Sequence, residues 1–297
     1  MSNTPDIATP VRTQAILNRY HLLAKKSLGQ NFLTDVDVLH QIVDVANISD
    51  QDDVIEIGPG IGGLTEQLAR SAHKVLGFEI DDKLIPVLHE TLSPYNNVKI
   101  INEDILQANL PKIIKEEFDS DHQVKVVANL PYYITTPIIL DLLKGNADFD
   151  AIVVMMQKEV ANRLTAKPGI KAYGSLSVII QYLNDAEIAL NVPRSSFIPS
   201  PHVDSAIVKL TGKKELKPIK MDQDIFFGFV RGCFAHRRKT LWNNLKTLFG
   251  NDADVKKKVQ QVLDQLNIKP QIRPGKLSID DFVNLANQFN VDQLLKS

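Results

Sequence analysis

The chain has almost no cysteine and no long apolar run. Its 297 residues include one cysteine, Cys233, which excludes an intrachain disulfide framework. Cys233 lies between Gly232 and Phe234, where a small apolar filler is expected rather than a catalytic thiol. No apolar run approaches the roughly 20 residues that span a membrane. The N-terminus has no apolar signal core, so a cytoplasmic protein without membrane attachment is expected.

Metal-ligand spacing is also missing, because the seven histidines are scattered, and we expect no metal site. Positive and negative charges nearly balance over the whole chain, but they are distributed unevenly along it. Residues 1–204 contain 17 basic and 26 acidic residues, a net charge of −9, and residues 205–297 contain 17 basic and 9 acidic residues, a net charge of +8. This asymmetry favours a C-terminal part that faces a polyanion. The alternative is an ordinary solvated lysine face.

Short apolar runs alternate with segments of helical periodicity in the first two thirds of the chain. The expected strands are DVIEIG, KVLGFEI, NVKIIN, VKVVANL and DAIVVMM, followed by AEIALNVP and DSAIVKLTG as a final antiparallel pair. Strands that alternate with helices predict a parallel sheet covered on both faces. From Asp222 onward the pattern is helical only, and GKKELKPIK reads as a linker. We therefore expect a domain over residues 1–212, with an N-terminal extension 1–24, and a helical domain over 213–297.

A glycine loop follows the first of these strands, in EIGPGIGGLTEQLA. Gly58, Gly60 and Gly63 satisfy the G-x-G-x-x-G pattern between a strand and a helix. Glu79 follows the second strand, 21 residues after Gly58, where a carboxylate can accept two ribose hydroxyls. This geometry suits NAD and also the adenosine of S-adenosylmethionine. Asp104, after the third strand, favours the methyl donor because an acid there can accept from the adenine amino group.

The stretch VVANLPYYITTPII ends a strand on an amide, a proline and an aromatic ring. The amino group of adenine is a poor nucleophile, and two acceptors can pull its N–H bonds out of plane. The Asn129 side-chain oxygen and the Leu130 carbonyl are candidates for these acceptors, and Tyr132 can stack on the base. Phe197, in SSFIPSPHVDSAIV, can close the other side of the base, although core packing is its plainer interpretation. Together they indicate an unpaired or flipped adenine.

These motifs resemble, in order and over nearly the whole chain, the ribosomal small-subunit RNA adenine-N6 dimethyltransferase family. The match runs from KKSLGQNFL through EIGPGIGGLT, GFEID, NEDIL, NLPYYI, FIPSPHVDS and HRRKTLWNNL to LSIDDFVNLAN. The resemblance implies a Rossmann-like, seven-stranded class I methyltransferase domain of the α/β class with a small all-helical C-terminal domain. It implies transfer of two methyl groups to each of two adjacent adenines near the 3′ end of small-subunit rRNA, within a 30S-type particle, in a role linked to ribosome biogenesis.

The resemblance also implies residue roles. S-adenosylmethionine would be held by Asn31, Leu33, Gly58, Glu79, Asp104 and Asn129, and for Asn31, Leu33 and Asn129 this donor-binding role rests on the resemblance alone. Arg237, Arg238 and Lys239 would contact RNA, on a helix anchored by Phe234 and Leu241. His236 and Trp242 depart from the family pattern, which has Gln and Arg there, and both lie on the face expected to contact RNA. We expect a monomer.

Three alternatives stay open. Erythromycin-resistance enzymes dimethylate a large-subunit rRNA adenine, but their second aromatic motif resembles Phe-x-Pro-Lys-Pro, whereas residues 197–201 here read FIPSP. An RNA-binding assembly factor with secondary methylation would tolerate changes at the donor residues, which are intact. An NAD oxidoreductase would bind nicotinamide and have no affinity for RNA.

Overall fold

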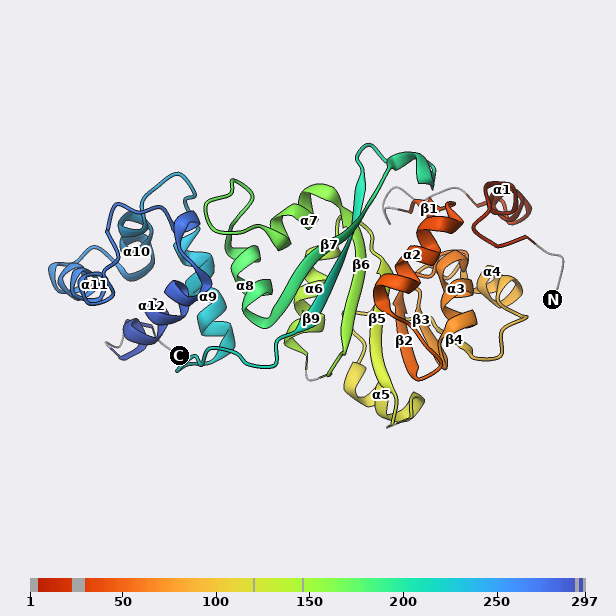
Figure 1. The fold of residues 1–297 in the computed structure, drawn as a ribbon, viewed down its shortest axis with the longest axis horizontal. Helices are drawn as coiled ribbons and strands as arrows, with labels where there is room; N and C mark the ends of the chain where they lie inside the picture. Colours follow the sequence, from red (N-terminus) through yellow and green to blue (C-terminus); the bar gives the residue numbers. More distant parts are fainter. Residues whose placement is uncertain (1–4, 23–29, 120, 146, 292–293, 296–297) are drawn as a thin grey trace. The chain divides into compact units, whose positions relative to one another are not determined.

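The computed structural model describes residues 5–22, 30–119, 121–145, 147–291 and 294–295. The chain divides into two compact units, one of residues 1–161 and 187–212, the other of 162–186 and 213–297 (Figure 1). The sequence predicts a single division after residue 212, whereas residues 162–186 cluster here with the C-terminal helices. A separately folding domain that begins at residue 213 stays a prediction. Of the N-terminal extension, residues 1–4 and 23–24 lie outside the described residues, as do residues 25–29 of KKSLGQNFL.

The predicted strands form one seven-stranded sheet in the part of the chain that the structure describes. In spatial order its strands are β4 (Val98–Ile101), β3 (Lys74–Phe78), β2 (Asp52–Ile57), β5 (Gln123–Asn129), β6 (Ala151–Gln157), β9 (Ser205–Gly212) and β7 (Asn184–Val192). Strands β4, β3, β2, β5 and β6 run parallel to one another, and β9 runs antiparallel to β6. The predicted fold class, a Rossmann-like methyltransferase sheet, is confirmed.

Helices cover the sheet, and its central strands are buried on both faces. Every residue of β2 is buried, as are six of the seven residues of β6. The helices of this unit are α1 (Pro10–Arg19), α2 (Val36–Ala46), α3 (Gly63–Ser71), α4 (Ile85–Thr91), α5 (Leu110–Glu117) and α6 (Thr135–Lys144). Helices α2 and α3 pack together over a core that includes Val54, Val127 and Ile207. A short antiparallel pair, β1 (Phe32–Leu33) with β8 (Phe197–Ile198), lies outside the main sheet.

The second unit is helical, as predicted for the end of the chain. It contains α8 (Ser175–Leu183), α9 (Gln223–Cys233), α10 (Leu241–Phe249), α11 (Ala253–Gln265) and α12 (Ile279–Val291), while α7 (Lys158–Thr165) begins in the first unit and ends in this one. Aromatic rings of α9 and α12 form its core, with Phe229 and Phe289 at 5.8 Å between centroids. Cys233 is buried there, and burial raises the pKa of its thiol, in keeping with the predicted filler. None of the described helices has the length and apolar character needed to cross a membrane.

Candidate active site

A pocket opens at the carboxyl ends of β2, β3, β4 and β5, where ligands bind in open α/β sheets. Almost all of the predicted donor and base residues line it. They are Asn31, Leu33, Gly58, Glu79, Asp104, Asn129, Leu130 and Tyr132. Residues that follow the parallel strands, from Gly58 to Tyr132, meet here although they lie up to 74 positions apart, because parallel strands end at the same edge. Phe197 is not among the residues that line the pocket.

The glycine loop after β2 is shaped by left-handed backbone conformations. Gly58 has φ of 72° and Gly60 has φ of 63°, a region that residues with a Cβ rarely adopt. The Gly58 N–H donates to the carbonyl of Phe78 at the end of β3, with 2.9 Å between nitrogen and oxygen. The Gly60 N–H donates to Oε2 of Glu79 at 3.1 Å. The loop is therefore bound to the neighbouring strand and its acid.

Glu79 is buried, and both of its carboxylate oxygens already accept backbone hydrogen bonds. Oε2 accepts from Gly60, and Oε1 accepts from the N–H of Asp81 at 2.9 Å. Burial raises the pKa of Glu79, while the N–H groups of Asp81 and Gly60 oppose that rise. These hydrogen bonds favour the ionised form and fix the direction of the carboxylate. The residue is equipped to accept hydroxyl groups from a ligand in the pocket.

Asp104 lies in the loop after β4, beside the loop that carries Glu79. Its Oδ1 accepts from the N–H of Leu106 at 3.1 Å, which orients the half-buried carboxylate. Asn102, two residues earlier, donates to the carbonyl oxygen of Glu79 at 2.9 Å. The loops that carry Glu79 and Asp104 are thereby connected, and both residues line the same pocket.

The segment that carries Asn31 and Leu33 is held over the pocket at both ends. On one side, the side-chain amide of Gln30 donates to Oδ2 of Asp81 at 2.9 Å. On the other side, Leu33 pairs with Phe197 in the short β1–β8 ladder. The sequence alone does not indicate this arrangement, because β1 and β8 are each two residues long and at least 164 positions apart.

Phe197 lies in the core and not against the pocket. Its side chain is 3% exposed and belongs to the same apolar cluster as Leu33 and Leu39. The structure therefore favours the plainer of our two interpretations, core packing. In this position Phe197 supports the strand that carries Leu33, so its effect on the pocket is indirect. A stacking role on the base stays a prediction that would need the side chain to move.

The Asn-Leu-Pro-Tyr turn follows β5 directly. The Nδ2 group of Asn129 donates to the carbonyl of Asn31 at 3.4 Å, which leaves Oδ1 on the opposite side of the amide. The Leu130 N–H donates to the carbonyl of Met155 on β6 at 3.1 Å. The Pro131 carbonyl accepts from the hydroxyl of Thr135 at 2.9 Å at the start of α6. The turn is therefore bonded to two neighbouring elements and is rigid.

Tyr132 is half-buried, and its ring is fixed by one hydrogen bond. Its hydroxyl lies 2.7 Å from Oγ of Ser205, the first residue of β9. Burial raises the pKa of Tyr132. The next residue, Tyr133, also lines the pocket and is 58% exposed, so two rings stand at the pocket where a flat base could lie.

Glu56 is a pocket residue that our sequence analysis missed. It lies within β2 and is 1% exposed, and no hydrogen-bond partner for its Oε2 is found among the described residues. Burial, with a contribution from the nearby charge of Glu79, raises the pKa of Glu56 to about 8. The signal in the sequence was available, because Glu56 interrupts the apolar residues Val54, Ile55 and Ile57 of a buried strand, where an acid is costly unless it has a function.

The basic triplet Arg237, Arg238 and Lys239 is exposed, but it does not lie on a helix. Its residues occupy the turn between α9 and α10, so the predicted basic helix is wrong. The flanking residues Phe234 and Leu241 are buried, as predicted. The guanidinium group of Arg237 donates to the carbonyls of Lys171, at 2.5 Å, and Tyr173, at 3.1 Å. Arg237 is therefore engaged within its own unit, and Arg238 and Lys239 are the better candidates for phosphate contacts.

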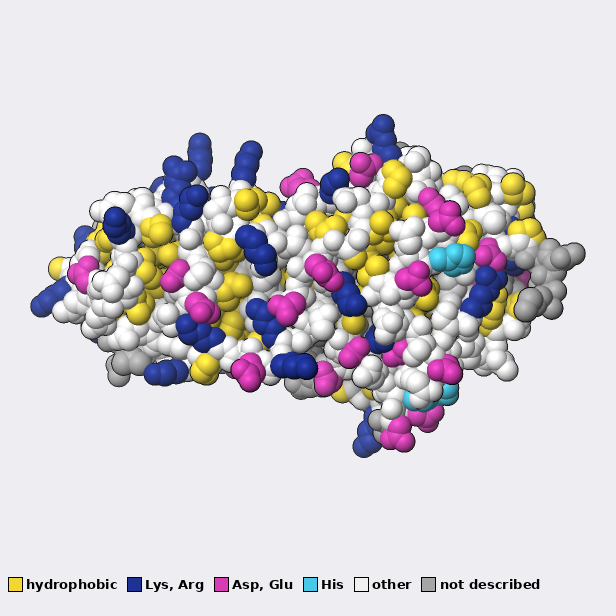
Figure 2. Space-filling view, in the orientation of Figure 1, with side chains coloured by type: hydrophobic (Ala, Val, Ile, Leu, Met, Phe, Trp, Pro, Cys, Tyr) yellow, Lys and Arg dark blue, Asp and Glu magenta, His cyan; other side chains and the backbone are white. Residues whose placement is uncertain are grey.

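Lysine and arginine side chains gather over the helical unit. Figure 2 shows them around α9 to α11, while acidic side chains are spread mainly over the sheet-containing unit. This distribution agrees with the net charges of −9 and +8 along the sequence. The surface of the helical unit therefore suits a polyanion.

Comparisons with known proteins point to one family. The family model for ribosomal RNA adenine dimethylase matches residues 21–290. The chain is 57% identical to ribosomal RNA small subunit methyltransferase A of Levilactobacillus brevis over 98% of each chain. It is 55% identical to the protein of the same name from Lactiplantibacillus plantarum, over 99% of this chain and 100% of the relative.

Two solved structures share the fold over most of the chain. A dimethyladenosine transferase from Plasmodium falciparum has a TM-score of 0.71 and 29% identity, over 87% of this chain and 97% of that one. The 23S rRNA methyltransferase ErmE has a TM-score of 0.67 and 26% identity, over 88% of this chain and 100% of that one. The match to the family model covers far more than half of the chain, and the chain therefore belongs to the ribosomal RNA adenine dimethylase family.

Proposed function

We propose that this protein dimethylates the N6 atoms of two adjacent adenines near the 3′ end of small-subunit rRNA. The observation that carries the proposal is the single pocket wall shared by the donor acids Glu79 and Asp104 and by the Asn-Leu-Pro-Tyr turn. Family membership excludes the oxidoreductase alternative, and S-adenosylmethionine is the methyl donor, as predicted. Identities of 52–57% to relatives named for the small subunit support that choice of substrate.

The residues of the pocket fit this donor. Glu79 is positioned to accept the ribose hydroxyls, and Asp104 the adenine amino group. Gly58 shapes the loop beside the ligand, because its φ of +72° is a conformation that residues with a Cβ rarely adopt. Oε2 of Glu56, which has no hydrogen-bond partner among the described residues, adds a further polar atom to this pocket. When bound, S-adenosylmethionine supplies a methyl group already activated by its positive sulfur.

The turn after β5 would hold and orient the target adenine. Oδ1 of Asn129 and the carbonyl of Leu130 are the two acceptors that draw the amino group out of conjugation with the ring. Tyr132 supplies a stacking face, a contact worth about 1–3 kcal/mol per base. No strong general base is needed, because the methylated ammonium product is acidic and can lose its proton to water. Most of the rate enhancement would therefore come from positioning.

The RNA partner would be bound outside the pocket by the basic helical unit, in the setting of a 30S-type particle and as a monomer. Exposed Arg238 and Lys239 would contribute phosphate contacts. A role as an assembly factor, in which methylation is secondary, is compatible with the same surfaces. It differs in predicting that an inactive variant still binds the particle and performs the biological task.

Transfer of labelled methyl groups to small ribosomal subunits that lack the modification tests the proposal. We expect four methyl groups per subunit, and mass spectrometry of rRNA fragments should find two dimethylated adenines near the 3′ end. Large ribosomal subunits serve as the parallel substrate. Labelling of the large subunit alone would replace this proposal with the erythromycin-resistance type of activity.

A further inference from the structure

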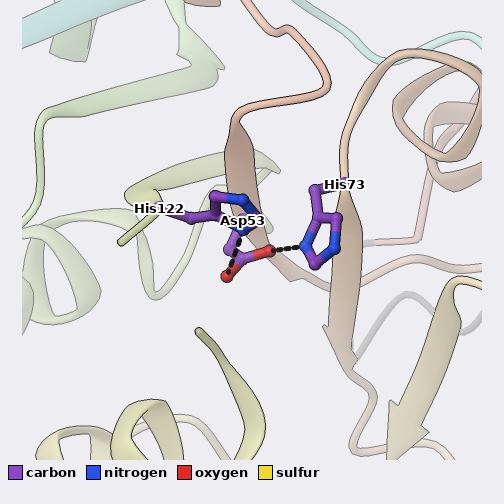
Figure 3. Close-up of side chains that lie close together, drawn as sticks. All are labelled: Asp53, His73 and His122. Carbon is purple, nitrogen blue, oxygen red and sulfur yellow. Dashed lines mark hydrogen bonds and ion pairs between the residues drawn. The ribbon is translucent and has the colours of Figure 1, made fainter. Parts of the chain in front are cut away.

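A cluster of one aspartate and two histidines lies at the end of the sheet opposite the active-site pocket. Asp53 is the second residue of β2, His73 directly precedes β3, and His122 directly precedes β5 (Figure 3). The three are therefore brought together by the amino ends of three neighbouring strands, whereas the active-site pocket lies at their carboxyl ends. We expected no metal site from the spacing of the histidines, and their separation of 49 residues explains why spacing could not reveal this one.

The ligand atoms of the cluster lie close enough together to hold one metal ion. One ligand atom from each residue can be chosen so that all three atoms lie within 4.8 Å of one another. Nδ1 of His122 lies 3.6 Å from Oδ2 of Asp53, and Nδ1 of His73 lies 2.9 Å from Oδ1 of the same carboxylate. Two ligands at about 2.0–2.2 Å from a tetrahedral zinc ion are separated by about 3.3–3.6 Å. The distance between Asp53 and His122 matches that separation.

Two of these atoms are also buried without a hydrogen bond. Among the described residues, neither Oδ2 of Asp53 nor Nδ1 of His122 has a hydrogen-bond partner, although both atoms are shielded from solvent. Buried polar atoms are nearly always satisfied, and an exception calls for an explanation such as an ion. The Asp53 side chain is fully buried, which distinguishes it from an ordinary exposed acid.

We propose that Asp53, His73 and His122 bind a zinc ion that links the amino ends of β2, β3 and β5. Two imidazoles and a carboxylate are borderline-to-hard ligands that suit zinc, and a water molecule would complete four-coordination. The Nε2 atom of His73 lies 3.9 Å from Oδ2 of Asp119, so binding through Nδ1 would direct the other ring nitrogen toward a carboxylate. This is the usual outer arrangement around a zinc-bound histidine.

The position of the site indicates a structural role. The ion would connect the segments before β3 and β5 to the central strand β2, at the end of the sheet opposite the methyl-transfer pocket. The alternative is a metal-free arrangement in which Asp53 accepts from His73 and the His122 ring packs edge-on against His73, with 4.0 Å between centroids. That arrangement accounts for His73, but it leaves the facing atoms of Asp53 and His122 unsatisfied.

The test is a zinc titration of the chelator-treated full-length protein against a chromophoric competitor. We expect one zinc ion per chain, and His122→Gln and Asp53→Asn should weaken the affinity by more than about tenfold. The control is His89→Gln, which alters an exposed histidine on α4 outside the cluster and should bind zinc as the wild type does. Circular dichroism in chelator establishes that each variant is folded, and His73→Gln replaces Asp53→Asn if that variant is not.

Two readouts separate a built site from loose surface binding. Cobalt substitution should give the strong visible absorption of a four-coordinate ion, and His122→Gln should abolish it. Zinc should raise the melting temperature of the wild type and leave that of His122→Gln unchanged, because only a ligand that prefers the folded state stabilises it. The absence of stoichiometric zinc binding, or equal affinity in wild type, His122→Gln and Asp53→Asn, would overturn the proposal.

Discussion

The hydroxyl of Tyr132 lies 2.7 Å from Oγ of Ser205, which joins the turn after β5 to the first residue of β9. Ser205 is completely buried, so the anchor is rigid. The hydrogen bond holds the ring by its polar edge and leaves its faces for other contacts. A tyrosine held in this way serves as a stacking platform at a small entropic cost on binding.

Tyr132→Ala should therefore lower kcat/KM for rRNA by about 5- to 150-fold, the equivalent of a lost base stack of about 1–3 kcal/mol. Ser205→Ala keeps the ring and removes only its anchor, so a loss of less than about tenfold is expected. Steady-state methylation of small subunits measures both. Equal activity of Tyr132→Ala and wild type would remove the ring from the base site.

Asn129→Ala should reduce the rate of methyl transfer by about 10²–10³, since it deletes one of the two acceptors proposed to act on the reacting amino group. Single-turnover labelling with saturating donor isolates this step. Some loss of donor affinity is also expected, and a calorimetric titration measures it separately. Asn18→Ala, at an exposed position on α1, is the matched control. A rate close to that of the wild type would refute the role given to the amide.

Glu79→Ala should weaken donor binding while the fold is retained, because the residue follows β3 at the edge of the sheet. Hydrogen bonds to a charged group contribute about 1.5–3 kcal/mol, which corresponds to a loss of about 10- to 150-fold in affinity. Calorimetry with S-adenosylmethionine or its demethylated product gives the value. Glu159→Ala, an exposed acid on α7, is the control, and an unchanged affinity in folded Glu79→Ala would place the ribose elsewhere.

Glu56 should make the stability of the free protein fall as the pH rises. Its pKa is about 8 in the folded protein against an ordinary value of 4.5, so between these values the folded state keeps a proton that the unfolded chain releases. Each pH unit in that window costs the wild type about 1.4 kcal/mol relative to Glu56→Gln. Urea unfolding of both proteins across the window measures the difference. Parallel stability curves would show that Glu56 ionises normally.

The residues of the basic turn should have two different functions, RNA binding for Arg238 and Lys239 and stability for Arg237. Replacing Arg238 and Lys239 by Gln should weaken binding to the small subunit and lower the slope of its salt dependence by about two units. Arg237→Gln should chiefly lower the melting temperature, since its guanidinium holds the carbonyls of Lys171 and Tyr173. Donor affinity should be unchanged in both variants.

The matched control for these salt series is the double replacement of Lys112 and Lys115 by Gln. Both lysines are exposed on α5, in the unit that contains the sheet. An unchanged slope for the variant at Arg238 and Lys239 would return these residues to the solvated-face interpretation. A slope reduced as much by Arg237→Gln as by that variant would show that the carbonyl contacts of Arg237 give way to phosphate.

The parts of the site that could be predicted from sequence are those formed by short runs of consecutive residues. The glycine loop and the turn that begins at Asn129 each follow a strand directly, and a parallel sheet brings such strand ends together without further information. Glu79 and Asp104 were located by the same rule. The sheet itself followed from alternating apolar and helical segments.

The parts that could not be predicted depend on long-range packing. The sequence left Phe197 open between stacking on the base and core packing, and its pairing with Leu33 and its burial favour the core. Asp53 and His122 have no regular spacing, and they meet because their strands are neighbours in the sheet. The triplet at Arg237 continued an apparently helical pattern, but the chain turns at Phe234 before α10 begins.

The backbone hydrogen bonds to Glu79 also bear on how fast the donor is captured. Gly60 and Asp81 each occupy one oxygen of the carboxylate, yet a carboxylate offers about four acceptor positions, so ribose hydroxyls can be added without displacing either N–H. The Glu79 side chain need not change its conformation, and no hydrogen bond need break, before this contact forms. Association at this acid should then be governed by diffusion into the pocket, and differences in affinity among donor analogues should arise in their dissociation rates.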